Sequence, residues 1–155
     1  MKGEKDMKQF ASPVKGKTFK IEEFPDEIIA EKTMGDGYGV FLTGNKIFAP
    51  FDCVIKVLYD AGHAICLESD SGLQIMVHIG VDTFKIQGMN KRHRKVGDKV
   101  KKGDLLITTN VNKLIKKTGN SATAIVFLSG ERITLIKDKM NVDYLEEDII
   151  KMEEV

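Results

Sequence analysis

The sequence contains no tryptophan, and phenylalanine and tyrosine bring the aromatic content to only 7%. This scarcity argues against a stacking platform for single-stranded nucleic acid, which is built from aromatic side chains. The 24 lysine and arginine residues are nearly balanced by 23 aspartate and glutamate residues, which leaves a net charge of +1. A general nucleic-acid binder carries a strongly basic face, so we expect no nucleic-acid partner.

Cysteine and long apolar runs are scarce as well. The two cysteines, Cys53 and Cys66, form no CxxC pair and no Cys/His ladder, which argues against a zinc module or a disulfide framework. No apolar run approaches the length of a membrane span, and charges occupy the N-terminal segment where a secretory signal has its apolar core. We therefore expect a cytoplasmic protein, not integral to the membrane, with two reduced thiols.

Short apolar runs broken by Gly, Asp, Asn and Pro dominate the sequence from Phe10 onward. Their length and near-regular spacing predict an all-β fold, either an antiparallel sandwich or a barrel. We expect a hairpin between residues 40–42 and 47–49, because Gly44 and Asn45 between them tolerate positive φ. Further strands are expected at residues 54–58, 64–67, 73–77, 105–109, 124–128 and 133–136.

Two short helices are expected among the strands. Residues 112–117 form the first, with Asn110 or Asn112 as its N-cap. Residues 141–154 form the second, because their apolar residues recur at helical spacing and their acidic residues take the opposite face. The apolar stripe consists of Val142, Leu145, Ile149 and Met152. The predicted organisation is a flexible segment at 1–9, a β-sandwich domain at 10–137 and an acidic C-terminal helix at 138–155.

Three histidines occur, and two of them lie at the ends of neighbouring strands. His63 begins one expected strand, His78 ends the next, and the turn-rich residues 68–72 join the two. If these strands pair as a hairpin, both imidazoles lie near the same open end. A histidine pair supports attack on phosphorus assisted by the second ring, general acid–base catalysis, or zinc ligation with Asp82 as the nearby third ligand.

Several segments occur together in a characteristic order. They are residues 12–16, 24–26, 31–37, 44–52, 63–65, 68–72, 77–83 and 96–100. In this order they resemble the glucose-type IIA domains of the bacterial phosphoenolpyruvate:sugar phosphotransferase system. The resemblance covers roughly residues 10–128, and its most specific motif is Val-His-Ile-Gly-Val-Asp-Thr at 77–83.

The resemblance implies an antiparallel β-sandwich (a barrel-sandwich hybrid) that serves as a phosphotransferase component. By motif, His78 would accept a phosphoryl group from the phosphocarrier HPr and pass it to a cysteine of a IIB domain for sugar uptake. His63 would steady the phosphoryl group. The family implies a monomer that needs no cofactor. The rim at which partners dock would consist of Asp82, Tyr59, Met76 and Phe84.

The sequence departs from the family pattern at two places near this motif. Ala61 stands where relatives often have a threonine that hydrogen-bonds near the active histidine. Residues 88–97 replace the usual Gly-Glu-Gly-Phe segment with a shorter, strongly basic one. We interpret the basic run at 91–95, which contains His93, as a solvated loop.

Two other functions compete with the phosphocarrier. A biotinyl or lipoyl carrier is opposed by chain order, because the turn at 96–104 precedes Lys139, whereas it follows the modified lysine in those domains. A degenerate or regulatory IIA-like module would bind a partner protein, with zinc shared between the two proteins at His63 and His78. The intact histidine pair and its flanking motif favour the phosphocarrier.

Overall fold

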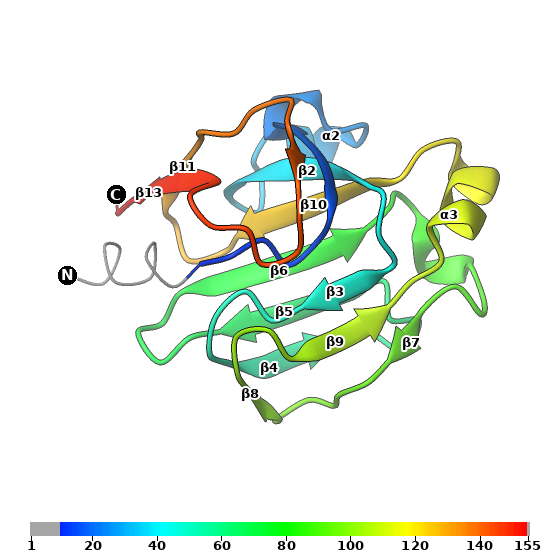
Figure 1. Ribbon diagram of the computed structural model, residues 1–155, viewed down its shortest axis with the longest axis horizontal. Coiled ribbons are helices and arrows are strands. Elements are labelled where there is room, and N and C mark those ends of the chain that lie inside the picture. The colour runs from blue at the N-terminus through cyan, green and yellow to red at the C-terminus, as the bar shows by residue number, and fades with distance from the viewer. Residues whose placement is uncertain (1–9, 155) are drawn as a thin grey trace.

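A computed structural model of the protein describes residues 10–154, so the segment predicted to be flexible at 1–9 lies outside the described residues. Short strands are the main regular structure in this part of the chain (Figure 1). The strands are β1 (Gly16–Lys20), β2 (Asp36–Leu42), β3 (Lys46–Phe48), β4 (Cys53–Leu58), β5 (Ala64–Glu68), β6 (Gln74–Ile79), β7 (Lys91–Arg92), β8 (Lys99–Val100), β9 (Leu105–Thr108), β10 (Ala122–Phe127), β11 (Arg132–Leu135), β12 (Asn141–Val142) and β13 (Ile150–Glu153). The helices are η1 (Ile21–Glu23), α2 (Glu27–Ala30), η2 (Thr83–Lys85) and α3 (Val111–Thr118).

The strands form three antiparallel sheets. The largest has eight strands in the order β12-β1-β2-β10-β6-β5-β4-β8. A sheet of three strands, β3-β9-β7, and a pair, β11-β13, complete the architecture. The predicted all-β antiparallel sandwich is therefore confirmed, and so are the six separately predicted strands, which correspond to β4, β5, β6, β9, β10 and β11.

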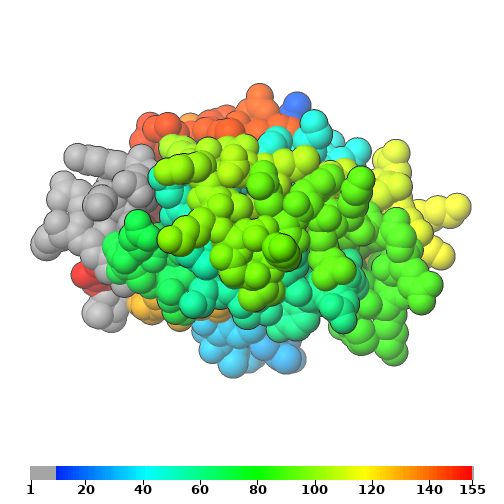
Figure 2. Space-filling model, turned by 90° about the horizontal axis from the view of Figure 1, so that it is seen from below, coloured from blue at the N-terminus to red at the C-terminus, as the bar shows by residue number. Residues whose placement is uncertain are grey.

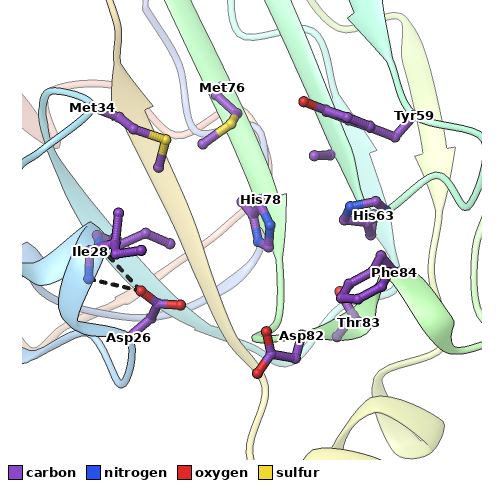
Figure 3. A pocket seen from close by; sticks show the side chains of 12 residues that line it. Asp26, Ile28, Met34, Tyr59, His63, Met76, His78, Asp82, Thr83 and Phe84 are labelled. Carbon is purple, nitrogen blue, oxygen red and sulfur yellow. Dashed lines mark hydrogen bonds between the residues drawn. The ribbon is translucent and has the colours of Figure 1, made fainter.

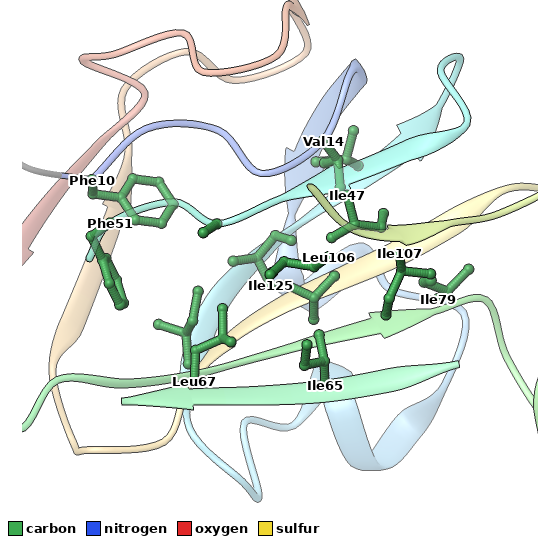
Figure 4. Close-up of a cluster of buried hydrophobic side chains, with 14 of the residues drawn as sticks. Phe10, Val14, Ile47, Phe51, Ile65, Leu67, Ile79, Leu106, Ile107 and Ile125 are labelled. Carbon is green, nitrogen blue, oxygen red and sulfur yellow. The ribbon is translucent and has the colours of Figure 1, made fainter. Parts of the chain in front are cut away.

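The main core lies between the large sheet and the three-stranded sheet. Successive side chains of a strand point to opposite faces, so every second residue of β5 and β6 turns inward. In Figure 4, Ile65 and Leu67 of β5 face Leu106 and Ile107 of β9 across this space. Full burial of one such side chain contributes about 1.5–3 kcal/mol. The sandwich is thus held together by aliphatic packing between its layers.

A second, smaller cluster covers part of the opposite face of the large sheet. Strand β10 is buried along its whole length, because its alternate residues enter the two different clusters. On the outer face Val126 packs with Phe19, Phe24 and Ile29, which belong to β1 and to the segment that contains η1 and α2. Met76 of β6 lies in the same cluster. The chain between β1 and β2 therefore covers the outer face up to the edge of β6.

The hairpin predicted between residues 40–42 and 47–49 is wrong. Strand β2 pairs with β1 and β10 in the large sheet, whereas β3 pairs with β9 in the three-stranded sheet. The Asn45 side chain accepts a hydrogen bond from the backbone N–H of Val111 at 3.0 Å, and its carbonyl accepts one from Thr109 at 2.7 Å. Gly44 and Asn45 thus carry the chain from one layer to the other.

The helix predicted at 141–154 is also wrong, and with it the description of 138–155 as a C-terminal helix. Leu145 and Asp148 have φ of 60° and 58°, which a right-handed helix does not accommodate. The residues on either side form β12, which pairs with β1, and β13, which pairs with β11. Val142 and Met152 are buried as expected, but they enter the main core from strands. Pairing with distant strands overrides the local helical spacing.

The short helix predicted at 112–117 is confirmed as α3, and the Asn110 side chain caps it by accepting from the N–H of Lys113 at 3.0 Å. Helix α2 was not predicted. Its N-cap is Asp26, whose carboxylate accepts from the N–H of Ile28 at 2.9 Å. Among residues 10–154, no helix has the length and apolar character needed to cross a membrane.

Candidate active site

The hairpin of β5 and β6 brings His63 and His78 together. Ala64 lies opposite His78 in the antiparallel register, and the backbone N–H of Ile79 donates to the carbonyl of His63 at 2.7 Å. The two imidazole rings are 5.5 Å apart between centroids and nearly perpendicular, at 82°. Both side chains are half-buried. The sequence prediction that the two histidines meet at one end of a hairpin is confirmed.

The orientation of the His78 ring is fixed by the backbone just beyond its strand. Its Nδ1 lies 2.9 Å from the carbonyl oxygen of Gly80. Gly80 reaches this position with φ of +73°, and a Cβ there would stand only 2.5 Å from Thr83 Cγ2 and 2.7 Å from Leu114 Cδ1. Only glycine meets both demands without strain. The Gly80 in the motif therefore presents its carbonyl to the histidine.

The His63 ring is held mainly by its neighbours. It lies between Tyr59, at 5.2 Å between ring centroids, and Phe84, at 6.4 Å. Its Nδ1 is buried and has no hydrogen-bond partner among residues 10–154. Burial, with a smaller contribution from the charge of His78, lowers the pKa of His63 below its usual value. The environment of His63 therefore favours the neutral form of its imidazole.

A hollow of about 330 Å³ opens over the two rings (Figure 3). The carboxylates of Asp26 and Asp82 lie along one side of the hollow in the view of Figure 3. The apolar residues Ile28, Met34, Tyr59 and Phe84 also line it, and each is exposed although its side chain is large and hydrophobic. An open site with an acidic and apolar border suits contact with another protein better than enclosure of a small molecule.

All of the predicted site residues line this hollow. Asp82, Tyr59 and Phe84 are exposed at its border, whereas Met76 is 7% exposed and forms part of its wall. Asp82 has φ of 53° and stands directly before η2, which carries Phe84. The turn after β6 thus places a carboxylate and an aromatic ring beside the histidine pair.

The sequence analysis missed the contribution of the segment around α2. Asp26, Ile28 and Met34 line the hollow across from Tyr59, His63 and Phe84 in Figure 3. The signal for this helix was present, because aspartate is a strong N-cap and Asp26 directly precedes Glu27–Ala30.

The basic run at 91–95 lies outside the lining of the hollow. Figure 2 shows the segment that follows β6, in green to yellow-green, spread across the face seen from below. Lys91 and Arg92 are exposed and pair with β9 as strand β7, and His93 Nε2 lies 2.8 Å from Thr108 Oγ1. The run is therefore solvated as predicted, but it is a short edge strand followed by a turn rather than a free loop.

The described residues offer neither a complete set of metal ligands nor an activated cysteine at the site. Within residues 10–154, no three His, Cys, Asp or Glu side chains gather where they could hold one metal ion. The two imidazoles alone fall short of the three or four protein ligands of a zinc site. Cys53 and Cys66 are both free, and burial raises the pKa of Cys53 to about 12, so neither is an activated nucleophile.

Comparisons with known proteins show the family to which the chain belongs. The family described as "phosphoenolpyruvate-dependent sugar phosphotransferase system, EIIA 1" matches residues 8–133. The chain belongs to this family. It is a glucose-type EIIA domain and a component of the phosphotransferase system. The matched range contains His63, His78 and every residue that lines the hollow.

Two curated relatives resemble the EIIA domain over most of its length. It is 33% identical over 142 residues to the PTS system glucose-specific EIICBA component of Staphylococcus saprophyticus. The aligned region covers 91% of this chain and 21% of that protein. It is 34% identical over 119 residues to the PTS system glucosamine-specific EIICBA component of Bacillus subtilis, covering 76% of this chain and 19% of that protein. The chain spans about a fifth of the length of these relatives.

A solved structure has the same fold. The glucose permease IIA from Mycoplasma capricolum superposes with a TM-score of 0.77 and covers 92% of each chain. The two sequences are 24% identical. This similarity independently confirms the antiparallel sandwich described above.

Proposed function

We propose that this EIIA domain is a phosphocarrier that accepts a phosphoryl group from HPr on Nε2 of His78. It then passes the group to a cysteine of a IIB domain for sugar uptake. The observation that carries the proposal is the 2.9 Å contact between His78 Nδ1 and the Gly80 carbonyl. A carbonyl oxygen can only accept, so Nδ1 carries the proton and Nε2 keeps its lone pair. The fold thereby prepares one ring nitrogen as a nucleophile.

The transfer needs no cofactor. The Nε2 lone pair attacks phosphorus while the bond between phosphorus and the donor breaks, and the donor leaves with the bonding electrons. In the second step the IIB thiolate attacks phosphorus, and Nε2 of His78 is the leaving group. The Nδ1 proton stays on His78 throughout, held by Gly80. The protein thus contributes the nucleophile and its orientation.

His63 is suited to steady the phosphoryl group. Its Nδ1 is the buried ring nitrogen, and its ring lies 5.5 Å from that of His78 across the floor of the hollow. An N–H at its Nε2 would donate to a phosphoryl oxygen as charge develops there. The incoming phosphoryl charge favours protonation of His63, which strengthens this hydrogen bond. Removing His63 should therefore slow transfer without removing the acceptor.

The border of the hollow suits transient docking of both partners. Exposed Ile28, Tyr59 and Phe84 offer apolar contact area, and Asp26 and Asp82 complement cationic side chains. A docked partner covers the hollow and keeps water from the phosphoryl group during transfer. Because the same border must accept first HPr and then IIB, a shallow contact of modest area is appropriate.

Intact mass spectrometry tests the proposal. The protein is incubated with phosphoenolpyruvate, enzyme I and HPr, and its mass is measured under alkaline conditions, where phosphohistidine survives. We expect one phosphate adduct in the native protein and none in His78→Gln. The His63→Gln variant should still acquire the adduct, more slowly. An adduct that persists in His78→Gln would contradict the assignment.

The same phosphorylation assay distinguishes a phosphocarrier from a regulatory module. A protein that keeps the fold without the relay would acquire no phosphate from HPr. If it instead bound zinc through His63 and His78, a partner protein would have to supply the missing ligands. Failure of phosphorylation in the native protein, followed by zinc binding only in the presence of a partner, would favour that reading.

A further inference from the structure

The turn that carries His63 is held from outside by a residue of another segment. Residues 59–63 connect β4 to β5, and the turn is closed by a hydrogen bond from the N–H of Gly62 to the Tyr59 carbonyl at 2.8 Å. The side chain of Asn90 donates from Nδ2 to the Ala61 carbonyl at 3.1 Å. A Cβ on Gly62 would lie 2.9 Å from Asn90 Cβ, so the two residues are in close contact.

Asn90 is itself firmly anchored. The preceding Met89 is 3% exposed and belongs to the main core. The following residues form β7, which pairs with β9. Arg92 adds a second contact to the same turn, because its Cγ lies 3.3 Å from a Cβ built on Gly62 and its guanidinium lies 3.8 Å from the carboxylate of Asp60. The turn therefore rests against a segment that is tied to both the core and a sheet.

The two histidines differ in what orients them. His78 has a hydrogen bond of its own, from Nδ1 to the Gly80 carbonyl. His63 has none at Nδ1 within residues 10–154, and that atom is buried. Its ring position thus depends on ring contacts and on the backbone of the turn. Whatever fixes the turn also fixes His63.

We propose that Asn90 is a positioning residue for His63: its side-chain amide clamps the turn at Ala61 and so holds the His63 ring beside His78. The expected effect on the rate of phosphoryl transfer rests on the proposed function. The positioning of His63 by Asn90 does not rest on it. The acceptor is the backbone carbonyl of Ala61, so the contact depends on the side-chain amide of Asn90 and on the path of the turn.

The proposal is tested with Asn90→Leu, which keeps the shape of the side chain over Gly62 and removes the N–H donor. Asn90→Ala removes the donor without adding apolar bulk and serves as a second variant should Leu disturb folding. The matched control is Asn120→Ala. Asn120 is also half-buried and also makes a side-chain hydrogen bond to backbone, at 2.9 Å to the N–H of Ala122, but it does not touch the turn.

The first readout is the titration of His63, followed by NMR with labelled histidine. Burial lowers its pKa in the native protein. A loosened turn admits water, so the pKa should rise towards the usual value near 6.5 in the Asn90 variants and stay unchanged in Asn120→Ala. An unchanged His63 pKa in folded Asn90→Leu and Asn90→Ala would overturn the proposal, as would an equal shift in the control.

The second readout is the rate of phosphoryl transfer from phosphorylated HPr to His78. A misplaced His63 should slow this step by about tenfold to a hundredfold, since a displacement of about 1 Å at a reacting site has effects of that size. The rate of Asn120→Ala should equal that of the native protein. If the native protein acquires no phosphate, the proposed function fails, and the titration still decides whether Asn90 positions His63.

Discussion

Gly80→Ala tests whether the turn after β6 has the steric demands that the structure gives it. Gly80 combines φ of +73° with crowding, because an added Cβ would lie 2.5 Å from Thr83 Cγ2 and 2.7 Å from Leu114 Cδ1. Gly88 is a matched control. It has φ of +72°, but a Cβ there would meet only Lys113 Nζ, at 3.6 Å. The two positions therefore share the backbone cost and differ in packing.

The expected magnitudes follow from these two terms. A left-handed conformation costs an alanine about 1–2 kcal/mol, and this cost applies to both variants. Overpacking of a closely packed site costs about 1–3 kcal/mol more, and this cost applies to Gly80→Ala alone. We expect Gly80→Ala to destabilise the protein by about 2–5 kcal/mol in total. This loss is a large fraction of the about 5–15 kcal/mol by which domains are stable, so circular dichroism must first show that Gly80→Ala is folded.

Urea unfolding followed by circular dichroism measures the difference, since the chain has no tryptophan to report by fluorescence. Histidine NMR on the same samples should show that the hydrogen bond from His78 Nδ1 is weakened in Gly80→Ala and intact in Gly88→Ala. Equal destabilisation of the two variants, or an unchanged His78 ring in Gly80→Ala, would refute the reasoning about this turn.

Three further predictions concern single groups. Asp26→Ala should cost about 1 kcal/mol in urea unfolding, because it removes the N-cap of α2, and Asp26→Asn, which keeps an acceptor, should cost much less. The pKa of His63, followed by NMR, should lie below 6.5 in the native protein and rise when His78 is phosphorylated; a fall would contradict the site geometry. Burial raises the pKa of Cys53 to about 12, so iodoacetamide at pH 8 should alkylate it far more slowly than in the urea-unfolded chain.

The strands β5 and β6, beside which the two histidines meet, could be predicted from the sequence because their signals are local. Turn residues at 68–72 separate two apolar runs of suitable length, and this pattern is sufficient to predict the hairpin of β5 and β6. Strand alternation then places His78 and Met76 on the face opposite the main core. The meeting of His63 and His78 follows from that hairpin.

The two wrong predictions, a helix and a hairpin, concern segments whose structure depends on pairing with strands far away in the sequence. The spacing of Val142, Ile149 and Met152 fits a helix, but positive φ at Leu145 and Asp148 and pairing with β1 and β11 produce two strands. Similarly, the glycine and asparagine after β2 fit a hairpin, yet the chain crosses to the other layer. Neither outcome depends on neighbouring residues alone, so local pattern could not predict it.

In the site, too, some residues could be predicted from local sequence and others could not. The motif around His78 predicts the phosphoryl acceptor, and Asp82 and Phe84, expected at the border from the resemblance, do line the hollow. The contribution of Asp26 depends on how the segment after β1 folds back over the large sheet. The contact between Asn90 and Ala61 joins residues 29 positions apart and has no signature in sequence spacing.

The central claim is that the contact between Nδ1 and Gly80 leaves Nε2 of His78 as the phosphoryl acceptor. It is tested most directly by NMR of the phosphorylated protein with 15N-labelled histidine, which distinguishes the two ring nitrogens. We predict a phosphorus–nitrogen bond at Nε2 of His78, with a proton retained at Nδ1. A phosphoryl group on Nδ1 of His78, or on His63, would contradict the account.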